Sequence, residues 1–287
     1  MIEDSSAPDP SCPRESAWAR ALDPLPSGRW KQALTGFTYP FRGLGFLRRE
    51  PMLLPLAIMP AVLNLGLAVV GLVLAFLQAP FLVGWLWQRP QATDLGTWLL
   101  AALWVLVAIL LGALVATLWL VLVYAVAGLV ATPFTDYLTE QVELKVLGLE
   151  GQDFRFGRFL RDMFWSLSHS LLNVLAWAAV MGLLLLLNLV PVLGSVVFGA
   201  LSATATAYFL AREMHDGCMT RRRLAWLEKQ RLVARHAPLM IGFGLGTMVL
   251  FWIPGFNLIM LPFAHVGGAL LYCRLAHNGH APLERKG

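Results

Sequence analysis

Positions 95–135 read LGTWLLAALWVLVAILLGALVATLWLVLVYAVAGLVATPFT, which is 41 residues without Asp, Glu, Lys or Arg. Three more stretches lack these residues, at 51–88, 163–211 and 236–273. A helix needs about 20 apolar residues to cross a bilayer core, and a charge at mid-membrane costs at least about 2.5 kcal/mol. Soluble helices carry a charged face, so a soluble core does not explain these stretches. We therefore predict an all-α integral membrane protein that crosses the bilayer several times.

The distribution of charge predicts how the chain is oriented. The mean hydropathy is +0.66, and only 14% of the residues are charged. All Lys and Arg residues except Arg89 fall in four groups, before position 51, at 145–161, at 212–235 and from 274 onward. The positive-inside rule places such groups in the cytoplasm, which predicts that both termini are cytoplasmic.

The ends of the chain differ in composition from its middle. Residues 1–28 are rich in Pro, Ser and acidic residues and lack a hydrophobic signal core, which predicts a disordered cytoplasmic tail. We expect a single membrane domain at 29–277 and a short cytoplasmic tail at 278–287. The three cysteines have no CxxC spacing, so we expect neither a disulfide framework nor a metal site.

The N-terminal half of the membrane domain predicts two long helices. Apolar and basic residues alternate at helical spacing over 29–49, which is typical of an interfacial amphipathic segment, although its Gly and Pro residues argue against one unbroken helix. A first membrane helix is expected at 51–78. A second is expected at 95–131, followed after Thr132-Pro133 by a separate amphipathic surface helix at 134–147.

The C-terminal half predicts two helical hairpins. The run at 163–211 contains a turn at 191–194, and the run at 236–273 contains a turn at 254–257. Neither tip carries a charge, so each hairpin either spans the bilayer fully or penetrates only part of it. Small residues at 194–207 and 267–269 are expected to allow close helix packing.

Four motifs stand out along the chain. They are, in order, Met59-Pro60-Ala61-Val62-Leu63-Asn64, Ala131-Thr132-Pro133-Phe134-Thr135-Asp136, Val190-Pro191-Val192-Leu193-Gly194 and Ile253-Pro254-Gly255-Phe256-Asn257. These motifs resemble those of the CysZ-like family, which includes the etoposide-induced (EI24 domain) membrane proteins. The resemblance implies two long transmembrane helices and two hairpins that partly penetrate the bilayer. It also implies a multi-pass protein of the plasma (inner) membrane that transports sulfate for cysteine synthesis and forms homo-oligomers.

One motif departs from this family. Sulfate-transporting members carry a Gly-Leu-Arg-Arg-like motif after the proline that matches Pro51, and its arginines and backbone amides hold the oxyanion. Here the matching residues are Met52-Leu53-Leu54-Pro55. Arg48 and Arg49 lie just upstream and are the candidates to replace the missing arginines.

The candidate substrate-binding residues combine these arginines with polar groups in the membrane runs. They are Arg42, Arg48, Arg49, Asn64, Asn257 and His265. The arginines alternatively serve as ordinary interfacial anchors. His265 alternatively makes a helix–helix hydrogen bond rather than carrying a proton. A further set of basic residues is interpreted as a solvated or lipid-facing helix surface, with an entry funnel for anions as the alternative; it comprises Arg221, Arg222, Arg223, Lys229, Arg231 and Arg235.

The sequence contains no HExxH, GxSxG or P-loop motif, so we predict that the protein is not an enzyme and uses no cofactor or nucleic acid. His215-Asp216 beside Cys218 resembles part of a catalytic cluster but lacks a partner motif. Two hypotheses remain. The first is a permease or channel for a small oxyanion such as sulfate. The second is a non-transporting membrane organiser of the same fold.

Overall fold

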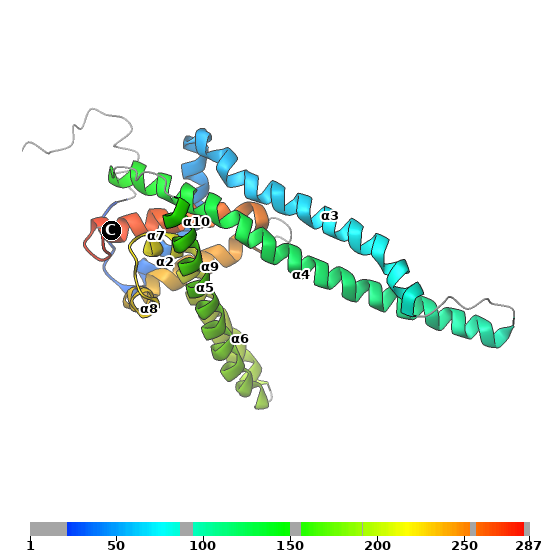
Figure 1. Ribbon diagram of the computed structural model, residues 1–287. Coiled ribbons are helices and arrows are strands. Elements are labelled where there is room, and N and C mark those ends of the chain that lie inside the picture. Colours follow the sequence, from blue (N-terminus) through cyan, green and yellow to red (C-terminus); the bar gives the residue numbers. More distant parts are fainter. Residues whose placement is uncertain (1–21, 87–93, 150–155, 191, 253–256, 284–287) are drawn as a thin grey trace, which may run out of the picture. The chain divides into compact units, whose positions relative to one another are not determined.

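The computed structural model describes residues 22–86, 94–149, 156–190, 192–252 and 257–283, and these contain helices but no strand. The chain forms two compact units (Figure 1). One unit comprises Met1–Ala57 and Thr135–Gly287, and the other comprises Ile58–Phe134. Most of the predicted tail at 1–28 lies outside the described residues, as do the predicted turn residues 254–256.

The second unit consists of two long apolar helices. Helix α3 (Leu54–Leu86) follows a short 3-10 turn at Pro51–Leu53, and helix α4 (Leu95–Leu147) is 53 residues long. Their segments Pro51–Leu74 and Gly96–Leu122 are long and apolar enough to cross a membrane. At 1.5 Å per residue α4 is about 80 Å long, well beyond a bilayer core of about 30 Å.

The predicted break in α4 at Thr132-Pro133 is wrong, because the backbone is helical from residue 95 to residue 147. A proline removes one backbone hydrogen bond but leaves the flanking turns able to continue. Flanking turns that make their own hydrogen bonds satisfy the backbone internally, which favours continuity near a membrane. The predicted surface helix at 134–147 is thus the end of α4, and its residues from Thr135 onward belong to the first unit.

Helix α2 (Arg29–Arg49) is also continuous, so the predicted interruption of this segment is wrong. Gly36, Pro40 and Gly43 lie on its buried face together with Tyr39 and Phe46. The small residues do not break the helix because they form the surface on which neighbouring helices pack.

Helix α2 packs on helix α9 (Ala237–Leu250) through glycines on both sides. A Cβ atom added at Gly36 would collide with the carbonyl oxygen of Leu239, and one added at Gly242 would collide with that of Ala33. Only glycine allows the two backbones to approach this closely. This crossing forms the centre of the first unit.

Helix α10 (Asn257–His277) uses the same kind of packing, as predicted for the small residues at 267–269. A Cβ atom at Gly267 would lie 2.5 Å from the carbonyl oxygen of Tyr39 in α2. A Cβ atom at Gly268 would lie 2.6 Å from that of Met214, in helix α6 (Leu193–Met214). The prediction of close packing is confirmed there, and α10 is wedged between α2 and α6.

Helices α5 (Phe156–Leu185) and α6 form the predicted first hairpin (Figure 1). Its arms are joined by hydrogen bonds from Trp177 Nε1 to Thr206 Oγ1 (3.2 Å) and from Asn173 Nδ2 to the carbonyl oxygen of Phe209 (3.3 Å). Near the tip, Leu189, Val192 and Leu193 are each at least 72% exposed. Such an exposed apolar tip is typical of a segment that contacts lipid.

Two short helices follow the hairpin, α7 (Asp216–Arg221) and α8 (Trp226–Arg235). The chain bends by 95° between α8 and α9. Helix α9 has 14 residues, so alone it reaches only about 21 Å. Within the described parts of the chain, four helices are long and apolar enough to span a membrane, and the bent pair α8–α9 would be a fifth.

Candidate functional site

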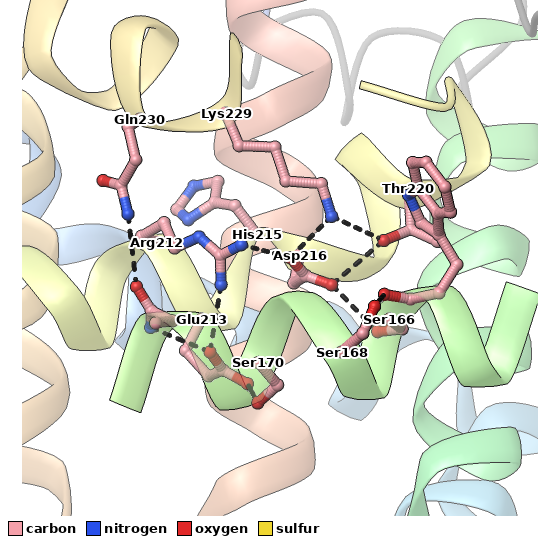
Figure 2. Close-up of polar contacts among 12 residues, drawn as sticks. Ser166, Ser168, Ser170, Arg212, Glu213, His215, Asp216, Thr220, Lys229 and Gln230 are labelled. Carbon is pink, nitrogen blue, oxygen red and sulfur yellow. Dashed lines mark hydrogen bonds and ion pairs between the residues drawn. The ribbon is translucent and has the colours of Figure 1, made fainter. Parts of the chain in front are cut away.

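A cluster of buried charges lies at the base of the α5–α6 hairpin, where the second arm, α6, ends (Figure 2). The centre is Asp216, at the start of α7. Its Oδ1 accepts a hydrogen bond from Lys229 Nζ (2.8 Å) and lies 3.2 Å from Nη2 of Arg212. Its Oδ2 accepts from Ser166 Oγ (2.9 Å) and Thr220 Oγ1 (3.0 Å). One carboxylate thus joins helices α5, α6, α7 and α8.

A second carboxylate, Glu213, lies at the outer edge of this cluster. It accepts hydrogen bonds from Ser170 Oγ and from Asn173 Nδ2 (2.9 Å), both on α5. Nη1 of Arg212 approaches it at 3.4 Å. The Arg212 side chain is fully buried, whereas the Glu213 side chain is 30% exposed. Glu213 therefore separates the buried guanidinium from the surroundings of the protein.

A chain of polar groups extends the cluster towards α8. Gln230 Nε2 lies 3.5 Å from Asn173 Oδ1, and the Tyr208 hydroxyl donates to Gln230 Oε1 (3.1 Å). Amides and hydroxyls both donate and accept, so they adapt to a change of charge at Glu213. The base of the hairpin is therefore polar, although its arms are apolar.

A separate ionic triad fixes the end of α4 to α7. Glu143 Oε1 lies 2.9 Å from Nη1 of Arg222 and 3.2 Å from Nη2 of Arg221. The guanidinium of Arg222 also lies 4.6 Å from the ring centre of Tyr272 in α10. Glu143 and Arg222 are both completely buried. An ion pair at such depth requires good geometry because both charges lose their hydration.

The surroundings set the ionisation of these groups. Burial alone would raise the pKa of Glu143, but Arg221 and Arg222 lower it to about 2. Burial would likewise raise the pKa of Asp216, and Lys229 and Arg212 lower it instead. Both carboxylates are therefore ionised at neutral pH, and each holds two cations inside the protein.

The structure places the three predicted arginines together on α2. Arg42, Arg48 and Arg49 are exposed, and Arg42 stacks at 4.7 Å on the ring of Tyr39. Arg48 and Arg49 occupy the last turn of the helix and form no ion pair within the described part of the chain. The neighbouring Glu50 instead pairs with Lys145. The arginines thus form a surface that is distinct from the buried cluster.

The other predicted residues lie elsewhere. His265 is on α10, where its Nδ1 donates to the carbonyl oxygen of Leu261 (3.0 Å). It lies near His215. Burial, together with the nearby His265, lowers the pKa of His215 to about 4. His265 therefore borders the buried cluster. Asn64 lies within α3 and Asn257 begins α10, and both side chains are outside the described atoms.

Sequence reasoning missed the cluster itself. The interpretation of the basic residues at 221–235 as a solvated or lipid-facing surface is wrong for Arg221, Arg222 and Lys229, because Arg222 and Lys229 are completely buried and Arg221 is only 13% exposed. Arg231 and Arg235 are exposed, as predicted. Each finds a carboxylate on another helix, and such pairing compensates for burial. The signal in the sequence was the mixture of signs at 212–216, where basic and acidic residues alternate at the end of an apolar run.

The donors of this cluster suit anions better than other ligands. Guanidinium, ammonium, hydroxyl and amide groups converge there, and such groups bind sulfate-like and phosphate-like oxygens. Among the described residues, no group of three His, Cys, Asp or Glu side chains is arranged to hold a metal ion.

Long apolar helices, an apolar hairpin and a charged base together define a multi-pass α-helical membrane protein. Residues 39–262 match the family described as sulfate transporter CysZ/etoposide-induced protein 2.4. The match covers more than half of the chain, and the protein belongs to this family.

A curated relative supports this assignment. The chain is 29% identical over 247 residues to a protein of Vibrio parahaemolyticus serotype O3:K6 (strain RIMD 2210633) named sulfate transporter CysZ. The similar region covers 84% of this chain and 95% of the relative. The likeness therefore extends over nearly the whole length of both proteins.

Proposed function

We propose that the protein is a permease or channel for a small oxyanion, with sulfate as the first candidate, and that it supports sulfur assimilation. The observation that carries the proposal is the buried polar cluster at the base of an apolar hairpin. It places two buried cations, Arg212 and Lys229, beside neutral donors such as Asn173. The name of the Vibrio relative supports sulfate as the oxyanion.

In this proposal the α2 arginines capture the anion. Arg42, Arg48 and Arg49 would raise the local anion concentration, and Asn64, Asn257 and His265 would contact the anion along its path. Exposed charges act in this way by steering an ion towards a site. Met52-Leu53-Leu54-Pro55 supplies no arginine, so Arg48 and Arg49 take that role.

We further propose that both termini are cytoplasmic, that the protein resides in the plasma (inner) membrane and that it forms a homo-oligomer. The last hairpin would penetrate only part of the bilayer. Helix α9 supports this idea, because its 14 residues reach about 21 Å and it turns by 95° into the amphipathic α8. Short, bent segments survive at membrane depth when they pack against protein, as the buried face of α9 does.

Replacement of Arg48 and Arg49 by Ala tests the capture step. We expect sulfate flux into proteoliposomes to fall at least about tenfold, because the steering charge at the end of α2 is lost. The matched control replaces Arg231 and Arg235 of α8 by Ala, which removes two other exposed charges. We expect that control to keep most of its flux.

A specific observation favours the alternative, a membrane organiser that does not transport. The family's oxyanion motif is absent at Met52-Leu53-Leu54-Pro55. Equal flux in the Arg48/Arg49 variant and in the wild type would reject the capture role of these arginines. An absence of flux in every correctly folded form would favour the organiser.

A further inference from the structure

The carboxylate of Glu213 is held by the kind of donors that bind an oxyanion. These donors are the Ser170 hydroxyl, the Asn173 amide and the Arg212 guanidinium (Figure 2). A carboxylate oxygen and a sulfate oxygen are equivalent acceptors for them. Glu213 thus occupies a position that an inorganic oxyanion would fill with the same contacts.

The neighbouring guanidinium of Arg212 has N–H groups that no described residue accepts from. Arg212 is completely buried, and its Nε and Nη2 have no hydrogen-bond acceptor among the described residues. Nη2 lies 3.2 Å from Asp216 Oδ1, but without the alignment of a hydrogen bond. Buried guanidinium N–H groups normally find acceptors, because leaving them without one is costly. The site therefore has more donor capacity than Glu213 uses.

Movement of the Glu213 carboxylate out of the cluster would also change the local net charge. Asp216 already neutralises Lys229, which donates to it at 2.8 Å, and accepts from two hydroxyl groups besides. Arg212 shares that same carboxylate, and its other carboxylate partner among the described residues is Glu213. If the Glu213 side chain turned outward, a buried positive charge would lack a counter-ion, which strongly favours the entry of an anion.

Glu213 is free to make this movement on structural grounds. Its side chain is 30% exposed, whereas those of Arg212 and Asp216 are buried. It stands in the last turn of α6, and rotation about its side-chain bonds requires no change of backbone. Such a rotation would move the outer carboxylate and leave the inner cations in place.

We propose that Glu213 is a tethered substitute for the transported oxyanion, which displaces it to bind Arg212, Ser170 and Asn173 at the base of the α5–α6 hairpin. This inference rests on the proposed oxyanion transport and names its internal binding site. Wild-type protein then binds anions weakly, because each anion competes with a carboxylate that is always present at high local concentration.

Sulfate binding to the full-length protein in detergent, measured by isothermal titration at constant ionic strength, tests this proposal. Glu213→Gln removes the competing charge, and we expect its sulfate Kd to be about tenfold lower than that of the wild type. Asn173→Ala in the Glu213→Gln background removes one donor and should weaken binding again by about tenfold. Thermal unfolding curves of each variant confirm that it is folded.

Glu228→Gln is the matched control, because it neutralises a carboxylate on α8 that caps the backbone N–H of Ala225 and contacts none of the cluster. Its sulfate Kd should equal that of the wild type. An unchanged Kd in Glu213→Gln, with measurable binding by the wild type, would overturn this inference and leave oxyanion transport intact. Absence of binding in both proteins would reject this site and oppose the transport function as well.

Discussion

Replacement of Glu143 by Gln is expected to lower the free energy of unfolding by about 3–5 kcal/mol. Gln has nearly the same shape, so the loss reflects charge rather than volume. The variant leaves Arg222 completely buried and Arg221 nearly so, with their shared carboxylate removed. Chemical denaturation in detergent micelles measures the difference.

The same triad predicts a dependence of stability on pH. The pKa of Glu143 is held at about 2, below its ordinary value of 4.5. Its stabilising contribution is therefore complete above pH 4.5 and is lost as the pH falls through about 2. The wild type should lose stability over this acid range, and Glu143→Gln should lack that part of the loss.

Two further variants separate charge from other causes. Lys145 lies on α4, like Glu143, and pairs with Glu50 at the end of α2, where both side chains are partly exposed. Lys145→Met removes this ion pair and should cost less than about 1 kcal/mol. The double variant Glu143→Leu/Arg222→Met should recover part of the stability lost in Glu143→Gln, because the completely buried Arg222 is removed together with its partner and only the 13% exposed Arg221 is left without the carboxylate. A Glu143→Gln protein as stable as the wild type would show that the triad does not fix α4 to α7.

Replacement of Gly242 by Ala should destabilise the first unit by about 3 kcal/mol. The added methyl group would overlap the backbone of Ala33 in α2, at its carbonyl group and Cα atom. Backbone atoms cannot rotate away, so α2 and α9 must separate. The loss of thermal stability in detergent provides the measurement.

Gly45→Ala is the control for this effect. Gly45 lies on α2, the helix against which Gly242 packs, but a Cβ atom added at Gly45 meets nothing within 4 Å. Alanine favours a helix over glycine by about 1 kcal/mol, so this variant should be as stable as the wild type or slightly more stable. Equal effects of the two substitutions would contradict the close α2–α9 crossing.

The class of fold could be predicted from the sequence, because charge-free runs report directly on the cost of charges in a bilayer. The hairpin around 191–194 and the close packing at Gly267 and Gly268 followed from the same kind of reasoning. Continuity of the helices could not be predicted. Gly36 and Pro40 are local helix breakers, and only the neighbours on which α2 packs explain why they are tolerated.

The buried cluster could not be predicted from the sequence for a different reason. Charged residues at 212–235 are typical of a solvated surface, and their burial depends on partners far away in the sequence. Arg222 is neutralised by Glu143, which lies 79 positions earlier, and Glu213 is held by residues of α5. Pairings over such distances follow from the tertiary structure and not from local patterns. The α2 arginines, by contrast, lie on one helix, and their position just before Pro51 is visible in the sequence; their role in binding stays a prediction.

Uptake of radiolabelled sulfate into proteoliposomes that contain the purified full-length protein is the most direct test of oxyanion transport. The proposal predicts saturable uptake above that of empty liposomes, with unlabelled sulfate as a stronger competitor than chloride. Uptake no greater than in empty liposomes, with the protein shown to be folded and inserted, would contradict it.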